Sequence, residues 1–344
     1  MKYVNIEGEE VYDKIKKRNE EFYEKSFKNT NQTFENYKRR GDTDIYHQRY
    51  APWALSRLSS GDIDEPVYPY GSGYEFKNGG EGVVIYVMDS GVNINHADFG
   101  GRASFGPNVA YNEKGIITEN GYDYGGHGTA VASLAVGSAF GTAKKAKLVS
   151  YKISAVGINF PIIRVAQALE DIANLIETAD DGRIASLLVF SSISNVPSQS
   201  WDDAAKEFKD MGYVYVAPAG NNKADSCTKS PMSSGAVLSV GSTDYTDSLQ
   251  STTNFGKCVD LYAPGVNVQF ASHLNDFGSR TNTGTSFSAP LVAGICANIL
   301  ADNPKYNLDQ IKEKLLSISV KNRINKIPEN TVNILAQAYT GSII

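Results

Sequence analysis

The sequence predicts an α/β fold of three layers, in which a mostly parallel central sheet carries helices on both faces. Short, continuous apolar runs of the kind that form buried strands recur along the chain, and helical patterns separate several of them. Strands that alternate with helices pair in parallel, because each helix returns the chain to the same end of the sheet. The functional side chains of such a sheet gather at the carboxyl ends of its strands.

The first 48 residues differ in composition from the rest of the chain. They are dense in both charges and poor in aliphatic side chains, so they cannot build a core of their own. We expect a surface helix or an extended linker over residues 1–48 and one large domain over residues 49–344. The segment also holds the glycosylation sequon Asn31-Gln32-Thr33, which is compatible with passage through a secretory pathway.

The expected strands and helices follow in order along the large domain. The strand candidates are residues 81–91, 147–153, 184–192, 213–221, 236–242 and 259–265. Helical patterns occupy residues 127–137, 162–177 and 200–212, and a fourth one begins at Ser286.

Ser286 stands directly before an apolar run with helical spacing, and we place Pro290 in the first turn of that helix, where proline is tolerated. A helix N-terminus offers a backbone N–H and the positive end of the helix dipole. Both suit a serine nucleophile, because an oxyanion forms beside it when it attacks a carbonyl group. The alternative interpretation is that Ser286 and Ser288 only cap the helix, and for an isolated serine this is the commoner case. A base and an acid elsewhere in the chain would decide between the two.

Three further polar residues stand at expected strand or helix ends. Asp89 closes a buried strand, where an ionised carboxylate needs a hydrogen-bond donor, although a simple Asx-turn also places an aspartate there. His127 opens a helix and can carry a proton near neutral pH, whereas a lone histidine is more often a packed or capping residue. Asn221 ends a strand after Gly220 and can donate a hydrogen bond to an oxyanion, or can simply occupy a left-handed turn.

The four residues come in the order Asp, His, Asn, Ser, and the order of the aspartate, histidine and serine is the one known for subtilisin. Long motifs surround the four residues. The motifs are APWALSRLSS from Ala51, VMDSGVNINHADFGGRA around Asp89, GGHGTAVAS around His127, PAGNNKADSC around Asn221 and TGTSFSAPLVAG around Ser286. From about Ala51 onward the chain resembles a subtilisin-type serine protease, most of all the proteinase K and cerevisin group of fungal enzymes. The resemblance implies that Asp89 orients His127, which serves as base and then acid for the nucleophile Ser286. It also implies that Asn221 and the Ser286 N–H form the oxyanion hole.

The resemblance implies two structural features as well. Cys227 and Cys258 match positions that are paired in cerevisin-like enzymes, so we expect this disulfide, and we expect Cys296 to be an inert core thiol. Asp260 falls where proteinase K-like enzymes place a calcium ligand, with the carbonyl group of Val237 as a second donor. The chemistry itself requires no cofactor, and a calcium ion would be structural.

The N-terminal residues resemble the end of an inhibitory propeptide. The stretch MKYVNIEGEEV is similar to the last strand of such a propeptide, and the charged linker follows it. On this interpretation residues 1–48 are a propeptide remnant plus linker, and the cleavage junction lies between about Arg40 and Ala51. The enzyme's own propeptide would then be an inhibitory partner.

The expected substrate groove departs from the family pattern. A peptide substrate should lie between two exposed strand edges. The residues expected at these edges are Asn159, Phe160, Ser192, Ile193, Ser194 and Gly220. Where the family has Ser-Leu-Gly-Gly this chain has Ser-Ile-Ser-Asn, and Pro161 has no N–H to donate. Bulk at Ser194 and Phe160 predicts a narrowed groove, restricted specificity or low turnover, and a preference for small or medium P1 residues.

We therefore expect a serine endopeptidase that acts on proteins or peptides. The competing hypothesis is a weak or inactive pseudoprotease with a structural or binding role in a cell wall or spore coat, which the altered groove favours. An esterase of the α/β-hydrolase class is disfavoured, because that class orders its triad Ser, Asp, His and uses a G-x-S-x-G elbow.

Composition and charge argue against several other functions. The net charge of −5 and the lack of a basic stripe give no support to nucleic-acid binding. No apolar run reaches the roughly 20 residues of a transmembrane helix, so we expect no membrane span. We expect a monomer. We also expect a protein of the secretory pathway, whether vacuolar, secreted or wall-associated, because the expected disulfide would seldom persist in the cytosol.

Overall fold

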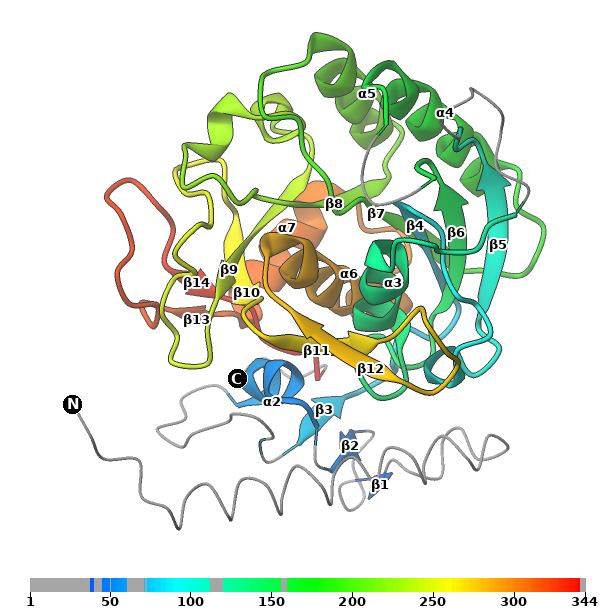
Figure 1. Cartoon of the computed structure of the whole chain (residues 1–344). Helices are drawn as coiled ribbons and strands as arrows, with labels where there is room; N and C mark the ends of the chain where they lie inside the picture. Colours follow the sequence, from blue (N-terminus) through cyan, green and yellow to red (C-terminus); the bar gives the residue numbers. More distant parts are fainter. Residues whose placement is uncertain are drawn as a thin grey trace.

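The computed structural model describes residues 38–39, 45–49, 51–60, 71, 73–111, 120–155 and 160–340. In this part of the chain nine strands form one main sheet (Figure 1). Across the sheet the order is β13 (Val320–Lys321), β14 (Ile334–Leu335), β10 (Leu261–Pro264), β9 (Leu238–Thr243), β8 (Val214–Pro218), β7 (Ala185–Val189), β4 (Val83–Asp89), β6 (Lys147–Lys152) and β5 (Ala103–Asn108). Neighbours from β14 to β5 pair in parallel, and β13 pairs with β14 in antiparallel fashion. The predicted α/β fold with a mostly parallel sheet is confirmed.

Helices cover both faces of this sheet, as Figure 1 shows. One face carries α3 (His127–Val136), α6 (Thr285–Asp302) and α7 (Leu308–Ile318), and the other carries α4 (Ile163–Glu177) and α5 (Gln199–Asp210). Strand β4 shows why both faces are covered. Its alternate residues from Val83 to Val87 join the core beneath α3 and α6, and those from Val84 to Met88 join the core beneath α4 and α5.

Helix α6 is the central helix of the larger core. Its length and apolar composition would allow it to span a membrane, but most of it is buried inside the fold. Between residues 284 and 300 every residue is buried except Ser286, which is partly exposed. The helix therefore belongs to the core of the domain and presents one serine at the surface.

Smaller elements surround the three layers. They are α2 (Trp53–Ser59), the sheet of β1 (Lys38–Arg39), β2 (Tyr46–Gln48) and β3 (Tyr74–Phe76), the hairpin of β11 (Val268–Ala271) and β12 (Ser279–Asn282), and the short 3-10 helices η1 (Ala97–Phe99), η2 (Ser226–Thr228) and η3 (Met232–Ser234). Strand β2 pairs with β3, and the ring of Tyr46 stacks on that of Phe76 with centroids 5.5 Å apart. Residues 46–48 thus pack onto the domain that we expected to begin at residue 49. Residues 1–37, which include the sequon at Asn31, lie outside the described residues. The propeptide interpretation therefore stays a prediction.

The expected disulfide is present. Cys227 and Cys258 are bonded, and their Cα atoms lie 5.1 Å apart. Cys296 is a buried free thiol on α6, and burial raises its pKa far above the usual range. The predicted disulfide and the predicted core position of Cys296 are confirmed. That Cys296 is inert stays a prediction, which its raised pKa supports.

Candidate active site

Four polar residues meet where strand ends face two helix N-termini. Asp89 is the last residue of β4, and Asn221 follows β8 by three positions. His127 is the first residue of α3, and Ser286 is the second residue of α6. The parallel sheet brings its carboxyl ends to one edge, and the contact between α3 and α6 brings both helix N-termini to the same edge.

The Asp89 carboxylate holds the imidazole of His127. His127 Nδ1 lies 2.8 Å from Oδ1 and 2.9 Å from Oδ2 of the buried Asp89, which also accepts the Ser90 N–H at 2.7 Å. Burial lowers the pKa of His127, but the charge of Asp89, the hydrogen bond to it and the charge of Asp123 together raise the pKa above its usual value. Because Nδ1 is bound to the carboxylate, Nε2 is the nitrogen that can exchange a proton with a nucleophile.

Glycine is required where the first turn of α3 approaches β4. A Cβ atom on Gly128 would lie 2.1 Å from the carbonyl oxygen of Gly91 and 3.0 Å from Cβ of Asp89. Gly126, the N-cap of the helix, has a left-handed φ of 86°. The Gly-His-Gly sequence thus lets the imidazole reach the carboxylate.

Ser191, which follows β7, supports the N-terminus of α6. Pro290 is the sixth residue of α6, in its second turn and not in the first as the sequence analysis placed it. It has no N–H, so it cannot donate to the carbonyl oxygen of Ser286 four residues earlier. The buried hydroxyl of Ser191 donates to that oxygen instead, at 3.0 Å. Ser191 therefore replaces the helical hydrogen bond that the proline removes.

The Ser286 hydroxyl is hydrogen-bonded to the backbone at the end of a neighbouring strand. It donates to the carbonyl oxygen of Ser191 at 3.2 Å, and no hydrogen bond within the described residues joins it to His127. The imidazole of His127 contacts the ring of Phe287, the residue after Ser286, and the two ring centroids are 6.0 Å apart. Catalytic hydrogen bonds are often long in ligand-free sites and tighten when substrate binds. Rotation about the Cα–Cβ bond of Ser286 moves Oγ away from Ser191.

Asn221 is held so that its amide nitrogen stays available. Its Oδ1 accepts the backbone N–H of Thr285 at 3.0 Å and the hydroxyl of Thr285 at 3.2 Å. No described residue accepts a hydrogen bond from Asn221 Nδ2 or from the N–H of Ser286. Two donors next to the Ser286 hydroxyl can bind a developing oxyanion.

Comparison with known proteins places this arrangement in a family. The family model described as "Subtilase family" matches residues 80–333. The chain belongs to the subtilase family. It is 31% identical over 314 residues to subtilisin-like protease 8 of Arthroderma otae, and the alignment covers 85% of this chain and 61% of that relative. It is 38% identical over 259 residues to the subtilisin-like serine protease Pen ch 13 of Penicillium rubens, and this alignment covers 74% of this chain and 60% of that relative.

Among solved structures, the fold is similar to the crystal structure of a cold adapted subtilisin-like serine proteinase. The TM-score is 0.73 at 31% identity, over 84% of this chain and 99% of that chain. The family and the fold predicted from the sequence are confirmed. The chain spans about three fifths of the length of the curated relatives described above.

Asp123 is a residue of this subtilase site that the sequence analysis missed. Its buried carboxylate accepts the N–H groups of Gly125, Gly126 and Thr129 at 3.0, 2.7 and 2.8 Å, and the hydroxyl of Ser90 at 2.8 Å. It therefore caps the N-terminus of α3 and fixes the loop before His127. An aspartate four positions before a helix-opening histidine was the available signal.

One predicted substrate edge is partly engaged within the protein. The N–H of Ser194 donates to the carbonyl oxygen of Ser230 at 2.8 Å, so it is not open to a peptide. A Cβ atom on Gly220 would lie 2.5 Å from Cδ1 of Ile193, so the isoleucine side chain covers this glycine. The predicted groove residues Ile193, after β7, and Gly220, after β8, therefore lie against each other.

The remaining groove residues lie differently from the expectation. The ring of Phe160 packs against Phe190 and Trp201, with centroids 5.2 and 6.3 Å apart. Its bulk therefore fills the core beneath α4 and α5, whereas the sequence analysis predicted that it narrows the groove. Ser192 is buried next to Ser191, and Asn159 lies outside the described residues.

The residues expected to bind calcium do not fit a calcium ion. Oδ1 of Asp260 lies 2.9 Å from the Lys312 ammonium of α7, and Oδ2 accepts the N–H of Ser239 at 2.8 Å. The side chain of Val237, whose carbonyl group was the expected second donor, is buried in the core under α5. Both carboxylate oxygens thus have protein partners, and the ammonium supplies the positive charge that a cation would bring.

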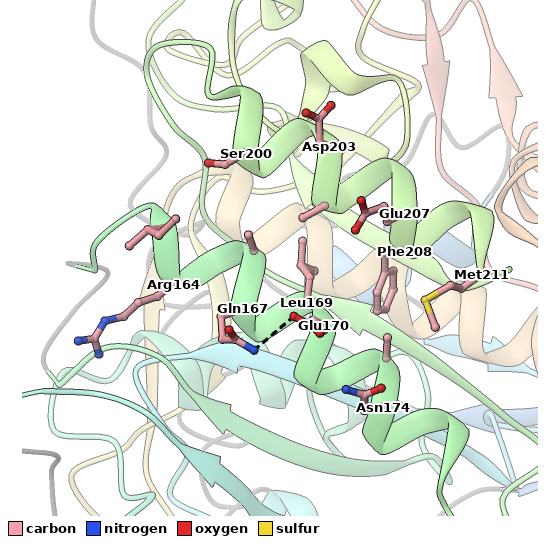
Figure 2. A pocket seen from close by; sticks show the side chains of 14 residues that line it. Arg164, Gln167, Leu169, Glu170, Asn174, Ser200, Asp203, Glu207, Phe208 and Met211 are labelled. Carbon is pink, nitrogen blue, oxygen red and sulfur yellow. Dashed lines mark hydrogen bonds between the residues drawn. The ribbon is translucent and has the colours of Figure 1, made fainter.

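A cavity of about 550 Å³ lies away from these residues, between α4 and α5 (Figure 2). The acidic side chains of Glu170, Asp203 and Glu207 line it together with polar and apolar ones, and Arg164 stands at one end. None of the candidate site residues lines this cavity, so it adds nothing to the catalytic centre.

Proposed function

We propose that the chain is a serine endopeptidase that hydrolyses peptide bonds of proteins or peptides through an acyl-enzyme. The observation that carries this proposal is the Asp89–His127 hydrogen bond, together with the positions of His127 and Ser286 at the N-termini of two helices that contact each other. Membership of the subtilase family supports it. A solved relative with this fold is described as a serine proteinase.

In the proposed mechanism His127 takes the proton of the Ser286 hydroxyl as Oγ attacks the scissile carbonyl carbon. Asp89 fixes the tautomer with the proton on Nδ1 and stabilises the imidazolium that forms. The oxyanion accepts hydrogen bonds from the N–H of Ser286 and from Asn221 Nδ2. His127 then gives its proton to the leaving amine, and water attacks the acyl-enzyme in a second cycle with the same roles.

We further propose restricted specificity with a preference for small or medium P1 residues. The support is the Ser194 edge, whose N–H is bonded to Ser230 and whose side chain is buried. A peptide that pairs with this edge must do without that donor or displace Ser230, so backbone pairing alone binds it weakly.

The alternative function is a pseudoprotease with a structural or binding role. The Ser286–Ser191 hydrogen bond favours it, because the hydroxyl must leave Ser191 before it can reach His127. The pair of open oxyanion donors favours the peptidase, because a fold kept for structure alone has no need of them.

The remaining parts of this proposal concern partners and location. We propose a monomer that needs no cofactor for its chemistry, that passes through the secretory pathway and that is inhibited by its own propeptide. The Cys227–Cys258 disulfide supports an oxidising compartment, whether vacuolar, secreted or wall-associated.

Digestion of a denatured proteome, with the new termini identified by mass spectrometry, tests this function. We expect cleavage by the wild type after small or medium residues and no cleavage by Ser286→Ala. Cleavage mainly after large aromatic residues would contradict the specificity. Equal products from both proteins would show a contaminating protease and contradict the peptidase.

A further inference from the structure

Lys152 is a buried cation behind the catalytic centre that the proposed mechanism does not use. It is the last residue of β6 and pairs with Asp89 in the register between β6 and β4. The side chain has an exposed fraction of 0%. Its ammonium donates to the carbonyl oxygens of Ser90 at 2.5 Å, Tyr122 at 2.7 Å and Ala155 at 3.5 Å.

These three carbonyl groups belong to three segments of the chain. Ser90 follows the catalytic aspartate, and Tyr122 lies in the loop that leads to the catalytic histidine. Ala155 lies three residues after the end of β6. One ammonium group therefore joins the end of β6 to the residue after the catalytic aspartate and to the loop that precedes the catalytic histidine.

Packing alone does not explain a charge at this position. Burying an ammonium is costly unless it is hydrogen-bonded and balanced by opposite charge, and an apolar side chain fills the same space more cheaply. No described carboxylate lies within ion-pair distance of Lys152. Burial lowers its pKa, and the charges of Asp123 and Asp89 act against that shift from further away.

Ser90 is held from both sides by buried groups of opposite charge. Its hydroxyl donates to Asp123 at 2.8 Å and accepts the N–H of Gly128 at 3.0 Å, while its carbonyl oxygen accepts from Lys152. Since its own N–H donates to Asp89, every polar group of Ser90 is fixed. The position of the aspartate relative to the first turn of α3 is thereby set.

We propose that Lys152 is a positioning residue of the catalytic centre, which fixes the aspartate and histidine loops and balances part of the negative charge around His127. The proposal rests on the assignment of Asp89 and His127 made above. The charged or titratable groups that face the imidazole are Asp89 from β4 and Asp123 from the preceding loop. In addition, the His273 ring of the β11–β12 hairpin lies close against Gly126.

An NMR titration of the full-length chain with labelled histidine tests this role, with the His127 signal assigned by its loss in His127→Gln. In Lys152→Met the pKa of His127 should rise by roughly half a unit to one unit, because the positive charge that offsets Asp123 and Asp89 is gone. The kcat for a peptide substrate should fall about tenfold to a hundredfold with KM little changed, because the aspartate and histidine are misplaced. Lys152→Arg, which keeps the charge, should keep the pKa of the wild type.

Lys144→Met is the matched control. Lys144 is another lysine with an exposed fraction of 0%, and its ammonium donates to the carbonyl oxygen of Ser138 at 2.9 Å. We expect this variant to lose stability and to leave the pKa of His127 unchanged. If Lys152→Met does not fold, Lys152→Gln, which has two donors and no charge, takes its place.

An unchanged His127 pKa in the Lys152 variant, or an equal shift in Lys144→Met, would show that Lys152 serves stability alone and would overturn the proposal. The titration does not depend on turnover. A wild type without peptidase activity therefore contradicts the proposed function, and the NMR result still decides the role of Lys152.

Discussion

At the scale of single residues, the site depends on side chains that are bound at one atom and open at another. His127 is bound through Nδ1, which leaves Nε2 for the nucleophile. Asn221 is bound through Oδ1, which leaves Nδ2 for an oxyanion. In each case the bound atom orients the free one before substrate arrives, and such preorganisation lowers the barrier.

Asn221→Ala removes one of the two oxyanion donors. We expect kcat to fall about 10²-fold to 10³-fold with KM nearly unchanged, because the hydrogen bond forms in the transition state. Steady-state kinetics on a peptide substrate measure this. The control is Asn222→Ala, whose exposed side chain makes no hydrogen bond among the described residues and which should keep wild-type activity. Equal losses in both variants would contradict the role of Asn221.

The raised pKa of His127 predicts a specific pH dependence. The base must be neutral, so kcat/KM should fall as pH falls through a midpoint above about 6.5, the usual value for histidine. Because the folded pKa is raised, protonated His127 also stabilises the fold below about pH 6.5, and this stability is lost as pH rises through the folded pKa. In Asp89→Asn the pKa measured by NMR should fall below that of the wild type. A midpoint below 6.5 in the wild type would be inconsistent with the Asp89 contact.

The Lys312–Asp260 ion pair predicts that Asp260 contributes no calcium-dependent stability. We expect calcium and EDTA to shift the melting temperatures of the wild type and of Asp260→Ala by the same amount to within about 1 °C, because Lys312 already pairs with the carboxylate that a calcium ion would bind. Thermal unfolding followed by circular dichroism measures this. A melting temperature that rises with calcium in the wild type and not in Asp260→Ala would refute this reading of the ion pair.

At the scale of elements, the N-termini of α3 and α6 set the geometry of the site. Helix α3 reaches the end of β4 through Gly128, and α6 keeps its second turn because Ser191 replaces the hydrogen bond lost at Pro290. Both solutions place a side chain at the positive end of a helix dipole. The two helices, and not the loops, therefore carry the histidine and the serine.

Gly128→Ala tests the approach of α3 to β4. The added Cβ would meet the Gly91 carbonyl oxygen at 2.1 Å, so we expect a loss of about 1–3 kcal/mol in the free energy of unfolding and a loss of activity. Denaturant unfolding measures the first effect. Gly182→Ala serves for comparison, because φ is 74° and nothing lies within 4 Å, so it should cost only about 1–2 kcal/mol and spare activity. Full activity in Gly128→Ala would mean that the close approach is not needed.

At the scale of the whole molecule, the topology of the sheet gathers residues that are far apart in sequence. Strands β4, β7 and β8 lie next to one another, so the residues after them, from 89, 191 and 221 onward, meet at one edge. This is why the apolar runs predicted the fold. The polar residues at the ends of those runs, Asp89 and Asn221, were predicted as site residues for the same reason. The family motifs then supplied the roles and the disulfide.

What the sequence could not predict are contacts between segments without a shared pattern. Lys152 and Ser191 are buried polar residues whose partners are backbone carbonyl groups of segments far away in the sequence, and nothing local marks such partners. Asp123 did have a local signal, because its N–H partners are the residues just after it. Lys312 reaches Asp260 from a helix that no motif connected to the strand. Phe160 was assigned to the groove from its position, but the direction of its ring depends on Phe190 and Trp201.

The most direct test of the central claim is mass spectrometry of the folded chain before and after a fluorophosphonate probe, which phosphonylates an activated serine with loss of fluoride. The assembled site predicts one adduct, on Ser286, that is absent in Ser286→Ala and retained in Ser288→Ala, whose hydroxyl is bonded to backbone carbonyl groups in the core. A folded wild type that gains no adduct would contradict the peptidase and support the structural alternative.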